Sequence, residues 1–168
     1  MWKKTLGALL IFVLALVVAV AVNTWRKGSR QLQVAPLAPL AIDEAAAAER
    51  LAQAVRLKTI SSATDANLNQ DQFLALHALL EKEFPKVHAT LRREVVNGLS
   101  LLYTWEGQDP KAKAILLAAH QDVVPVAPGT EGDWQEPPFA GFVKDGYIWG
   151  RGSWDDKGNL FSQMEAVE

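Results

Sequence analysis

The stretch AILLAAHQDVVP, residues 114–125, indicates the class of fold, because it joins an apolar run directly to a cluster of polar side chains. Its first six residues are all apolar, which is typical of a strand that is covered on both faces in an α/β sheet. His120 stands where this run stops, and Asp122 follows two residues later. We therefore predict an α/β fold with a site just beyond the strand, where sites are built in such sheets.

The pair of His120 and Asp122 is suited to a metal site. Residues i and i+2 of an extended segment point to the same side, so Asp122 can reach one nitrogen of the His120 ring. Such a carboxylate orients the ring and leaves its other nitrogen free for a metal. A helix cap or a loop ion pair is the alternative reading of this short pattern. The chain has no cysteine, so any metal site must use histidine and carboxylate ligands.

Two hairpins are predicted from their turns. Residues 90–96 and 99–105 flank Asn97-Gly98, a dipeptide that suits a type I′ turn. Residues 142–144 and 147–149 form a second candidate pair around Asp145-Gly146.

Three helices are predicted in the part of the chain that follows the linker. Asp43 is a suitable N-cap for a helix over residues 43–57, and a second helix over residues 71–84 stops at Pro85. The apolar spacing of Leu160, Met164 and Val167 indicates a third, which is still running at the last residue. We expect His77, near the second helix, and His88, in a loop after it, to be structural or solvent-facing rather than ligands.

The first 27 residues form a signal anchor or a signal peptide. Residues 5–22 carry no charge and span about 27 Å as a helix, enough for a transmembrane helix. A signal peptide fits the small-x-small site Ala19-Val20-Ala21, whereas a retained anchor fits Trp25 and the basic residues behind it. Either reading exports the rest of the chain, which is then membrane-anchored or secreted. Residues 28–42 form a proline-containing linker, and residues 43–168 form the globular part.

The charge of the globular part argues against a nucleic-acid partner. From Asp43 onward, 12 basic residues face 19 acidic ones, a net charge of −7. Binding to phosphates requires a basic face, which this balance does not favour.

A glycine-rich segment carries the second cluster of polar residues. Residues 150–158 read GRGSWDDKG, between a predicted strand and a predicted helix. Glycines allow tight turns, and carboxylates are favoured at a helix N-terminus. The spacing of a phosphate-binding GxxxxGK[ST] loop is absent. We expect Arg151 and Lys157 to shape this loop, and Trp134 and Phe139 to serve packing.

Together these motifs resemble the M20 family of zinc peptidases, in particular its branch of carboxypeptidase S and PM20D1-like enzymes. The resemblance implies the N-terminal part of a zinc-peptidase (phosphorylase/hydrolase-like) catalytic domain over residues 43–168, truncated at its C-terminus. It makes His120 a metal ligand, Asp122 the catalytic carboxylate that orients it, and Asp155 the ligand that bridges two Zn2+ ions. The family's peptide bond at the position of Asp155-Asp156 is often cis.

The activity implied by the resemblance is zinc-dependent hydrolysis of amide bonds in small peptides or N-acyl amino acids. An N-acyl amino-acid synthase using the same site, and a non-catalytic membrane-anchored module, remain alternatives. The family's general-base glutamate and its remaining ligands would lie beyond Glu168. A zinc site normally needs at least three protein ligands, so we expect this chain alone to bind zinc poorly and to be inactive.

Overall fold

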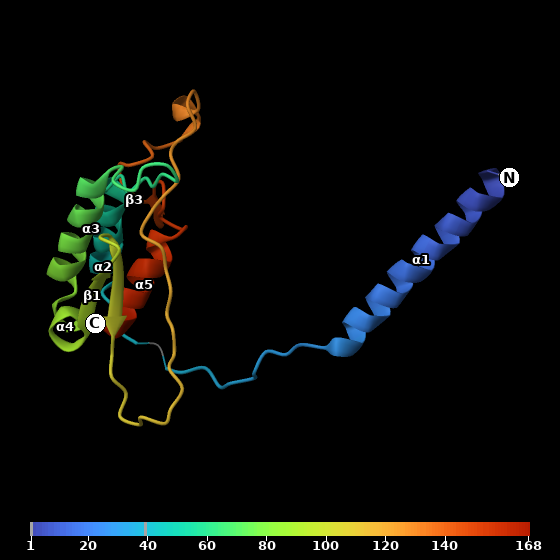
Figure 1. Ribbon diagram of the computed structural model, residues 1–168, viewed down its shortest axis with the longest axis horizontal. Helices are drawn as coiled ribbons and strands as arrows, with labels where there is room; N and C mark the ends of the chain where they lie inside the picture. Colours follow the sequence, from blue (N-terminus) through green and yellow to red (C-terminus); the bar gives the residue numbers. More distant parts are fainter. Residues whose placement is uncertain (1, 39) are drawn as a thin grey trace. The chain divides into compact units, whose positions relative to one another are not determined.

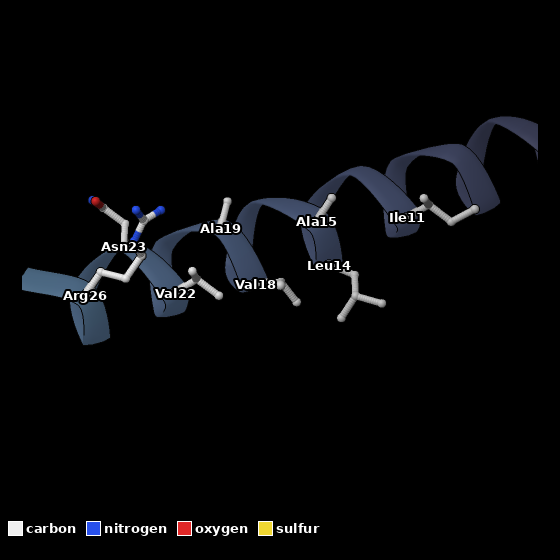
Figure 2. Close-up of a pocket in the computed structure, with 8 residues that line it drawn as sticks. All are labelled: Ile11, Leu14, Ala15, Val18, Ala19, Val22, Asn23 and Arg26. Atoms are coloured by element: carbon white, nitrogen blue, oxygen red, sulfur yellow. The ribbon is translucent and has the colours of Figure 1, made fainter.

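The computed structural model describes residues 2–38 and 40–168, which belong to two units that divide between Leu40 and Ala41. The first unit contains helix α1 (Trp2–Lys27), whose 26 residues are long and apolar enough to cross a membrane, although a signal sequence passes the same test (Figure 1). In Figure 2, the small side chains of Ala15 and Ala19 lie along one side of α1, and Asn23 continues this side toward the end of the helix.

The second unit is built on three helices, α2 (Glu44–Arg56), α3 (Gln70–Glu83) and α5 (Lys157–Val167). Asp43 caps α2 as expected, because its carboxylate accepts a hydrogen bond of 3.0 Å from the N–H of Ala46. Helices α2 and α5 are also joined by the half-buried pair of Arg50 and Glu165, whose two nitrogen–oxygen distances are 2.5 and 2.7 Å.

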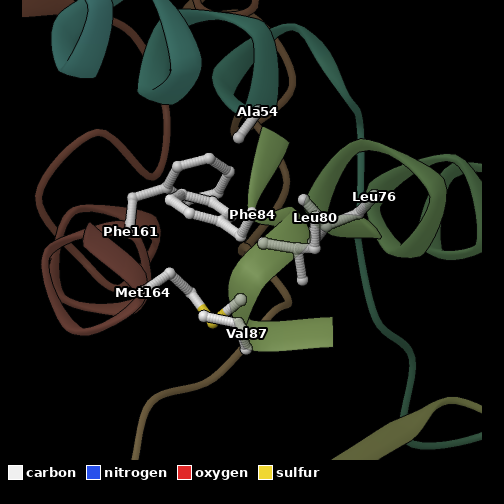
Figure 3. Packing of buried hydrophobic residues seen from close by; sticks show 7 residues of the cluster. All are labelled: Ala54, Leu76, Leu80, Phe84, Val87, Phe161 and Met164. Carbon is white, nitrogen blue, oxygen red and sulfur yellow. The ribbon is translucent and has the colours of Figure 1, made fainter. Parts of the chain in front are cut away.

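An apolar cluster fills the space between these helices (Figure 3). The rings of Phe84 and Phe161 meet edge to face with their centroids 5.6 Å apart. The buried members of the cluster are Ala54, Leu76, Leu80, Phe84, Val87, Phe161 and Met164.

Both predicted hairpins are present and antiparallel. Strands β1 (Arg92–Val96) and β2 (Ser100–Thr104) pair around Asn97-Gly98, with φ of 50° and 86° at the turn. Strands β3 (Phe142–Lys144) and β4 (Tyr147–Trp149) pair around Asp145-Gly146, with φ of 54° and 78°. Positive φ at both central residues is what a type I′ turn requires.

The buried strand predicted over residues 114–119 is wrong. The segment has no strand assignment, and the side chains of Ile115 and Leu116 are 88% and 81% exposed. A buried strand needs hydrogen-bonded neighbours and a covered face. Among the described residues, each strand pairs only within its own hairpin, so none flanks this segment. The one pairing nearby is a parallel bridge between Ile60 and Val123, just beyond the predicted strand.

A short helix, α4 (Pro85–Thr90), follows α3 where the sequence suggested a loop. Pro85 ends α3 but also begins α4, since proline is well tolerated at the first position of a helix. His88 therefore lies in a helix and not in a loop. Its ring bonds to the carbonyl oxygen of Phe84 and to the hydroxyl of Tyr103, each at 2.8 Å. A single 3-10 turn, η1 (Glu131–Asp133), precedes the second hairpin.

Candidate metal centre

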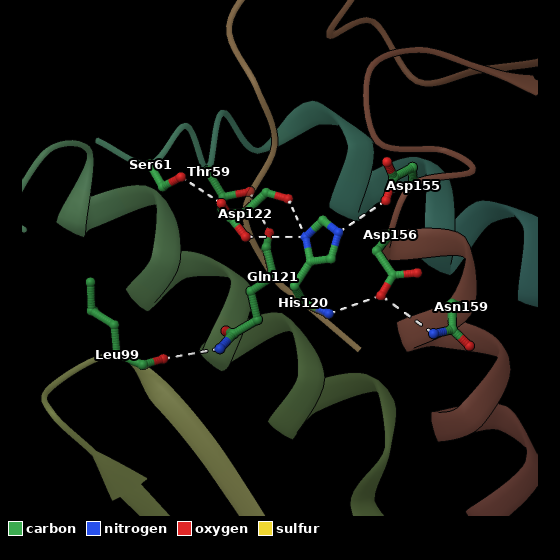
Figure 4. A network of polar contacts seen from close by, with 9 residues as sticks. All are labelled: Thr59, Ser61, Leu99, His120, Gln121, Asp122, Asp155, Asp156 and Asn159. Atoms are coloured by element: carbon green, nitrogen blue, oxygen red, sulfur yellow. Dashed lines mark hydrogen bonds and ion pairs between the residues drawn. The ribbon is translucent and has the colours of Figure 1, made fainter. Parts of the chain in front are cut away.

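The imidazole of His120 lies between two carboxylates (Figure 4). Its Nδ1 is 3.0 Å from the carbonyl oxygen of Asp122 and 3.1 Å from Oδ1 of the same residue. Both partners are acceptors, so Nδ1 carries the proton that is shared with them. Nε2 lies 2.9 Å from Oδ1 of Asp155. The structure thus brings together all three residues that the sequence singled out.

Residues at the start of α5 hold the backbone at and before His120. The N–H of His120 donates a hydrogen bond of 2.9 Å to Oδ2 of Asp156. The side chain of Asn159 donates to the carbonyl oxygen of Ala118 at 3.1 Å, and Gln163 donates to the same oxygen at 3.0 Å. The segment before His120 is therefore fixed to α5 although it belongs to no sheet.

The glycines of residues 150–158 permit close packing of backbone around the site. A Cβ at Gly152, whose φ is +83°, would lie 2.5 Å from Cγ1 of Val123. A Cβ at Gly158 would lie 2.4 Å from the carbonyl oxygen of Ser153. The peptide bond between Asp155 and Asp156 is cis, as the family resemblance led us to expect.

Lys157 and Arg151 shape the loop, as expected. The Lys157 side chain is fully buried and donates to the carbonyl oxygens of Ala54 at 2.8 Å and Leu57 at 2.7 Å. Burial lowers its pKa to about 8. The guanidinium of Arg151 lies over the ring of Trp134, 5.0 Å from its centroid.

Residues 59–61 also contact the site, a role that we did not predict from the sequence. The hydroxyl of Thr59 donates to the carbonyl oxygen of Gln121 at 2.7 Å, and the N–H of Val123 donates to the carbonyl oxygen of Thr59 at 2.9 Å. The hydroxyl of Ser61 donates to Oδ2 of Asp122 at 2.5 Å. The signal in the sequence was the alternation of two hydroxyl residues, Thr59 and Ser61, just after the helix predicted over residues 43–57.

His77 has the structural role that we expected. It is buried, and its Nε2 lies 3.1 Å from the carbonyl oxygen of Leu99 and 2.9 Å from Oε1 of Gln121. Because both partners accept, Nε2 carries a proton. Burial lowers the pKa of His77, and the hydrogen bond to Gln121 opposes this in part. Gln121 is thereby held on the side of the chain opposite to His120 and Asp122.

The donor set at His120 fits part of a zinc site. Zinc takes imidazole nitrogen and carboxylate oxygen, and Nε2 of His120 and Oδ1 of Asp155 converge. The second imidazole nitrogen faces a carboxylate, as in most histidine ligands. Burial opposes protonation of the ring, but the hydrogen bond with Asp155 and the charges of Asp122 and Asp156 raise its pKa overall. In the described part of the chain, no three or more His, Asp or Glu side chains form a complete metal-binding group.

Comparisons with known proteins also indicate a metallopeptidase of the M20 family. The profile of Peptidase family M20/M25/M40 matches residues 116–168. The "Probable carboxypeptidase S-like 2" of Dictyostelium discoideum is 42% identical over 99% of this chain and 33% of its own length. "Carboxypeptidase S" of Saccharomyces cerevisiae is 46% identical over 71% of this chain and 22% of its own length. The human "N-fatty-acyl-amino acid synthase/hydrolase PM20D1" is 38% identical over 71% of this chain and 24% of its own length.

A solved structure resembles the chain as well. It is an M20 family metallo-carboxypeptidase, Sso-CP2 from Sulfolobus solfataricus, with a TM-score of 0.54 and 25% identity over 75% of this chain and 26% of that one. The chain spans a third or less of the length of these proteins. Its mixed helix and sheet structure resembles the M20 peptidase domain, and its relatives are carboxypeptidases and amidohydrolases of that family. The chain belongs to the M20 family of peptidases.

Proposed function

We propose that this chain supplies the first metal ligands of a zinc-dependent amidohydrolase that cleaves small peptides or N-acyl amino acids. The observation that carries the proposal is the convergence of Nε2 of His120 on Oδ1 of Asp155 at 2.9 Å, while Nδ1 is held by Asp122. His120 would hold a zinc ion through Nε2, Asp155 would be the carboxylate shared by two zinc ions, and Asp122 would orient the imidazole.

The protein's own groups prepare this site before a metal arrives. Asp122 accepts the proton of Nδ1, so that Nε2, which faces Asp155, is the nitrogen that can give up its proton to take a metal. Asp156 fixes the backbone N–H of His120 at 2.9 Å and so sets the position of the ring relative to Asp155. Bound zinc would supply a water molecule of lowered pKa and polarise the scissile carbonyl group.

The names of two groups of relatives support the substrate class. One group is named carboxypeptidase S and the other N-fatty-acyl-amino acid synthase/hydrolase. Both names describe an amide bond next to a free carboxylate. Human PM20D1 is named for both directions of the reaction, so net synthesis of N-acyl amino acids is a second candidate. Measuring both directions on one N-acyl amino acid separates the two.

The helix α1 supports a location at a membrane. It is long and apolar enough to span the hydrocarbon core, and 26 residues at 1.5 Å each extend about 39 Å. We propose that α1 is a signal anchor or a cleaved signal, that residues 28–42 are a linker, and that residues 43–168 work on the exported side.

The test is substitution of the two ligands in the protein encoded by the gene that carries this chain. His120→Ala and Asp155→Ala should each abolish release of the amino acid from an N-acyl substrate, with unchanged circular dichroism. Asp145→Asn is the matched control, because Asp145 lies in the turn between β3 and β4, and it should keep full turnover. Full turnover in both ligand variants would refute the metal assignment.

A further inference from the structure

The two oxygens of the Asp122 carboxylate have different partners (Figure 4). Oδ1 faces Nδ1 of His120 at 3.1 Å, and Oδ2 accepts the hydroxyl proton of Ser61 at 2.5 Å. A carboxylate that is bonded through only one oxygen can turn about its terminal torsion, which is broad in free aspartate. A bond to each oxygen fixes this torsion and therefore the direction from which Asp122 meets the ring.

The position of Ser61 is set independently of its own hydroxyl group. Thr59, two residues earlier, is fully buried and is tied to the chain at Gln121 and Val123 by two hydrogen bonds of 2.7 and 2.9 Å. Ile60 forms a parallel bridge with Val123. Since residues i and i+2 of an extended segment face the same way, Ser61 is directed toward Asp122 by contacts that do not involve its side chain.

The neighbouring serine serves a different purpose. The hydroxyl oxygen of Ser62 accepts hydrogen bonds from the N–H groups of Thr64 and Asp65, both at 3.2 Å. This is the local turn function that serine commonly has in loops. Ser61, in contrast, donates to a residue 61 positions away. Local loop structure therefore accounts for Ser62 but not for Ser61.

We propose that Ser61 is a positioning residue for His120 and acts through Asp122. With Oδ2 held by Ser61, Oδ1 stays in line with Nδ1 of the ring, which favours a proton on Nδ1 and leaves Nε2, beside Asp155, as the nitrogen that exchanges its proton for a metal. The proposal rests on the proposed function insofar as it assigns Nε2 to a metal. The effect of Ser61 on the ring itself can be measured without metal.

The experiment uses the full chain in detergent micelles with 15N-labelled histidine, in an Asp155→Ala background, because the Asp155 carboxylate 2.9 Å from Nε2 would itself hold a proton on that nitrogen. The sequence has three histidines, so three ring systems appear, and His120→Gln assigns the one of interest. At alkaline pH, where the imidazoles are neutral, long-range proton–nitrogen spectra report which nitrogen carries the proton. The Asp155→Ala chain should show the proton of His120 on Nδ1, where Asp122 accepts it.

Ser61→Ala should shift this ring toward the form with the proton on Nε2, which a free histidine prefers. Ser61→Thr keeps the hydroxyl and should keep the original spectrum, and Ser62→Ala is the matched control that should not change it. Ser61 is exposed, so removal of its hydroxyl should leave the fold intact. The same ring spectrum with and without Ser61→Ala would overturn the proposal, as would a proton on Nε2 in the parent Asp155→Ala chain.

A second measurement separates this inference from the proposed function. With Asp155 intact, zinc chloride is titrated against a chromophoric chelator in the protein encoded by the gene that carries this chain and in its Ser61→Ala, Ser61→Thr and Ser62→Ala variants. Ser61→Ala should bind zinc about tenfold more weakly, at the lower end of the range for partners of metal ligands, and Ser61→Thr should restore the affinity. If zinc does not bind to the unaltered protein of that gene, or binds equally well after His120→Gln, the metal assignment fails, whereas the metal-free spectra still decide the role of Ser61.

Discussion

The ammonium group of Lys157 donates a hydrogen bond of 2.7 Å to the carbonyl oxygen of Leu57, the residue that ends α2. A second bond, of 2.8 Å, goes to the carbonyl oxygen of Ala54 in the last turn of the same helix. A cation is favoured at this end of a helix because the last carbonyl groups point out of it. Lys157 begins α5, so one buried side chain joins the end of α2 to the start of the helix that follows Asp155.

Replacement of this lysine should destabilise the fold. Lys157→Met fills a similar volume but removes the donors from two carbonyl groups in a buried place, at a cost of roughly 1–3 kcal/mol. Urea unfolding of the full chain in micelles, followed by tryptophan fluorescence, measures the free energy of unfolding. Lys113→Met is the control, because Lys113 is exposed, and it should change stability by less than about 0.5 kcal/mol. Equal effects of the two substitutions would contradict this role for Lys157.

His77 should make the fold sensitive to acid. Burial lowers its pKa from the ordinary value of 6.5, so the unfolded chain takes up a proton more readily than the folded one. The contribution of His77 to stability is therefore complete above pH 6.5 and is lost as the pH falls below it, with a slope of at most about 1.4 kcal/mol per pH unit.

The variant His77→Gln tests this directly. Glutamine keeps a donor near the position of Nε2 but does not titrate, so unfolding curves between pH 5 and 8 should fall less steeply for the variant. Above pH 7.5 the two proteins should depend on pH in the same way. A variant that loses stability as steeply as the unaltered chain below pH 6.5 would rule out His77 as the source.

Gly158→Ala should destabilise the chain although alanine is the better helix former. Propensity alone favours alanine by up to about 1 kcal/mol. The added Cβ would, however, lie 2.4 Å from the carbonyl oxygen of Ser153, which is backbone and cannot rotate away. Overpacking of this kind typically costs 1–3 kcal/mol, so the clash should prevail. Gly132→Ala, where the Cβ meets open space, should change the thermal midpoint little. A higher midpoint for Gly158→Ala would contradict the close approach.

Asp122→Asn should weaken zinc binding without unfolding the chain. Ser61 and the Nδ1 of His120 both donate to the carboxylate, so an amide group must turn its NH2 toward one of these donors. Loss of such a partner typically lowers metal affinity 10- to 100-fold. Competition with a chelator, in the protein encoded by the gene that carries this chain, measures the change, and Asp133→Asn, at an exposed acid of η1, is the control. Unchanged affinity would show that Asp122 does not orient a ligand.

Much of the local structure could be predicted from the sequence because single residues determine it. Asn97-Gly98 and Asp145-Gly146 can adopt positive φ, and this conformation defines both hairpins. Asp43 caps α2 through its own side chain. The meeting of His120 with Asp122 also follows from their spacing in one segment.

What could not be predicted depends on contacts between distant parts of the chain. Pro85 is compatible both with the end of α3 and with the start of α4. The packing of Val87 in the core favours formation of α4. The approach of Asp155 to His120 was expected only from the family resemblance, since 35 residues separate them. The partner of Ser61 could not be predicted, because it lies 61 residues away along the chain.

The exposed run at residues 115–117 has a practical consequence for the handling of the protein. Ile115, Leu116 and Leu117 are 88%, 81% and 59% exposed, and the six residues 114–119 contain no charge, proline or glycine. Extended segments with free backbone groups and this composition recruit strands from other molecules. During concentration of the purified chain, intermolecular β-aggregation that begins at this run will limit solubility before unfolding does. The substitution Leu116→Lys will raise the concentration at which the chain aggregates.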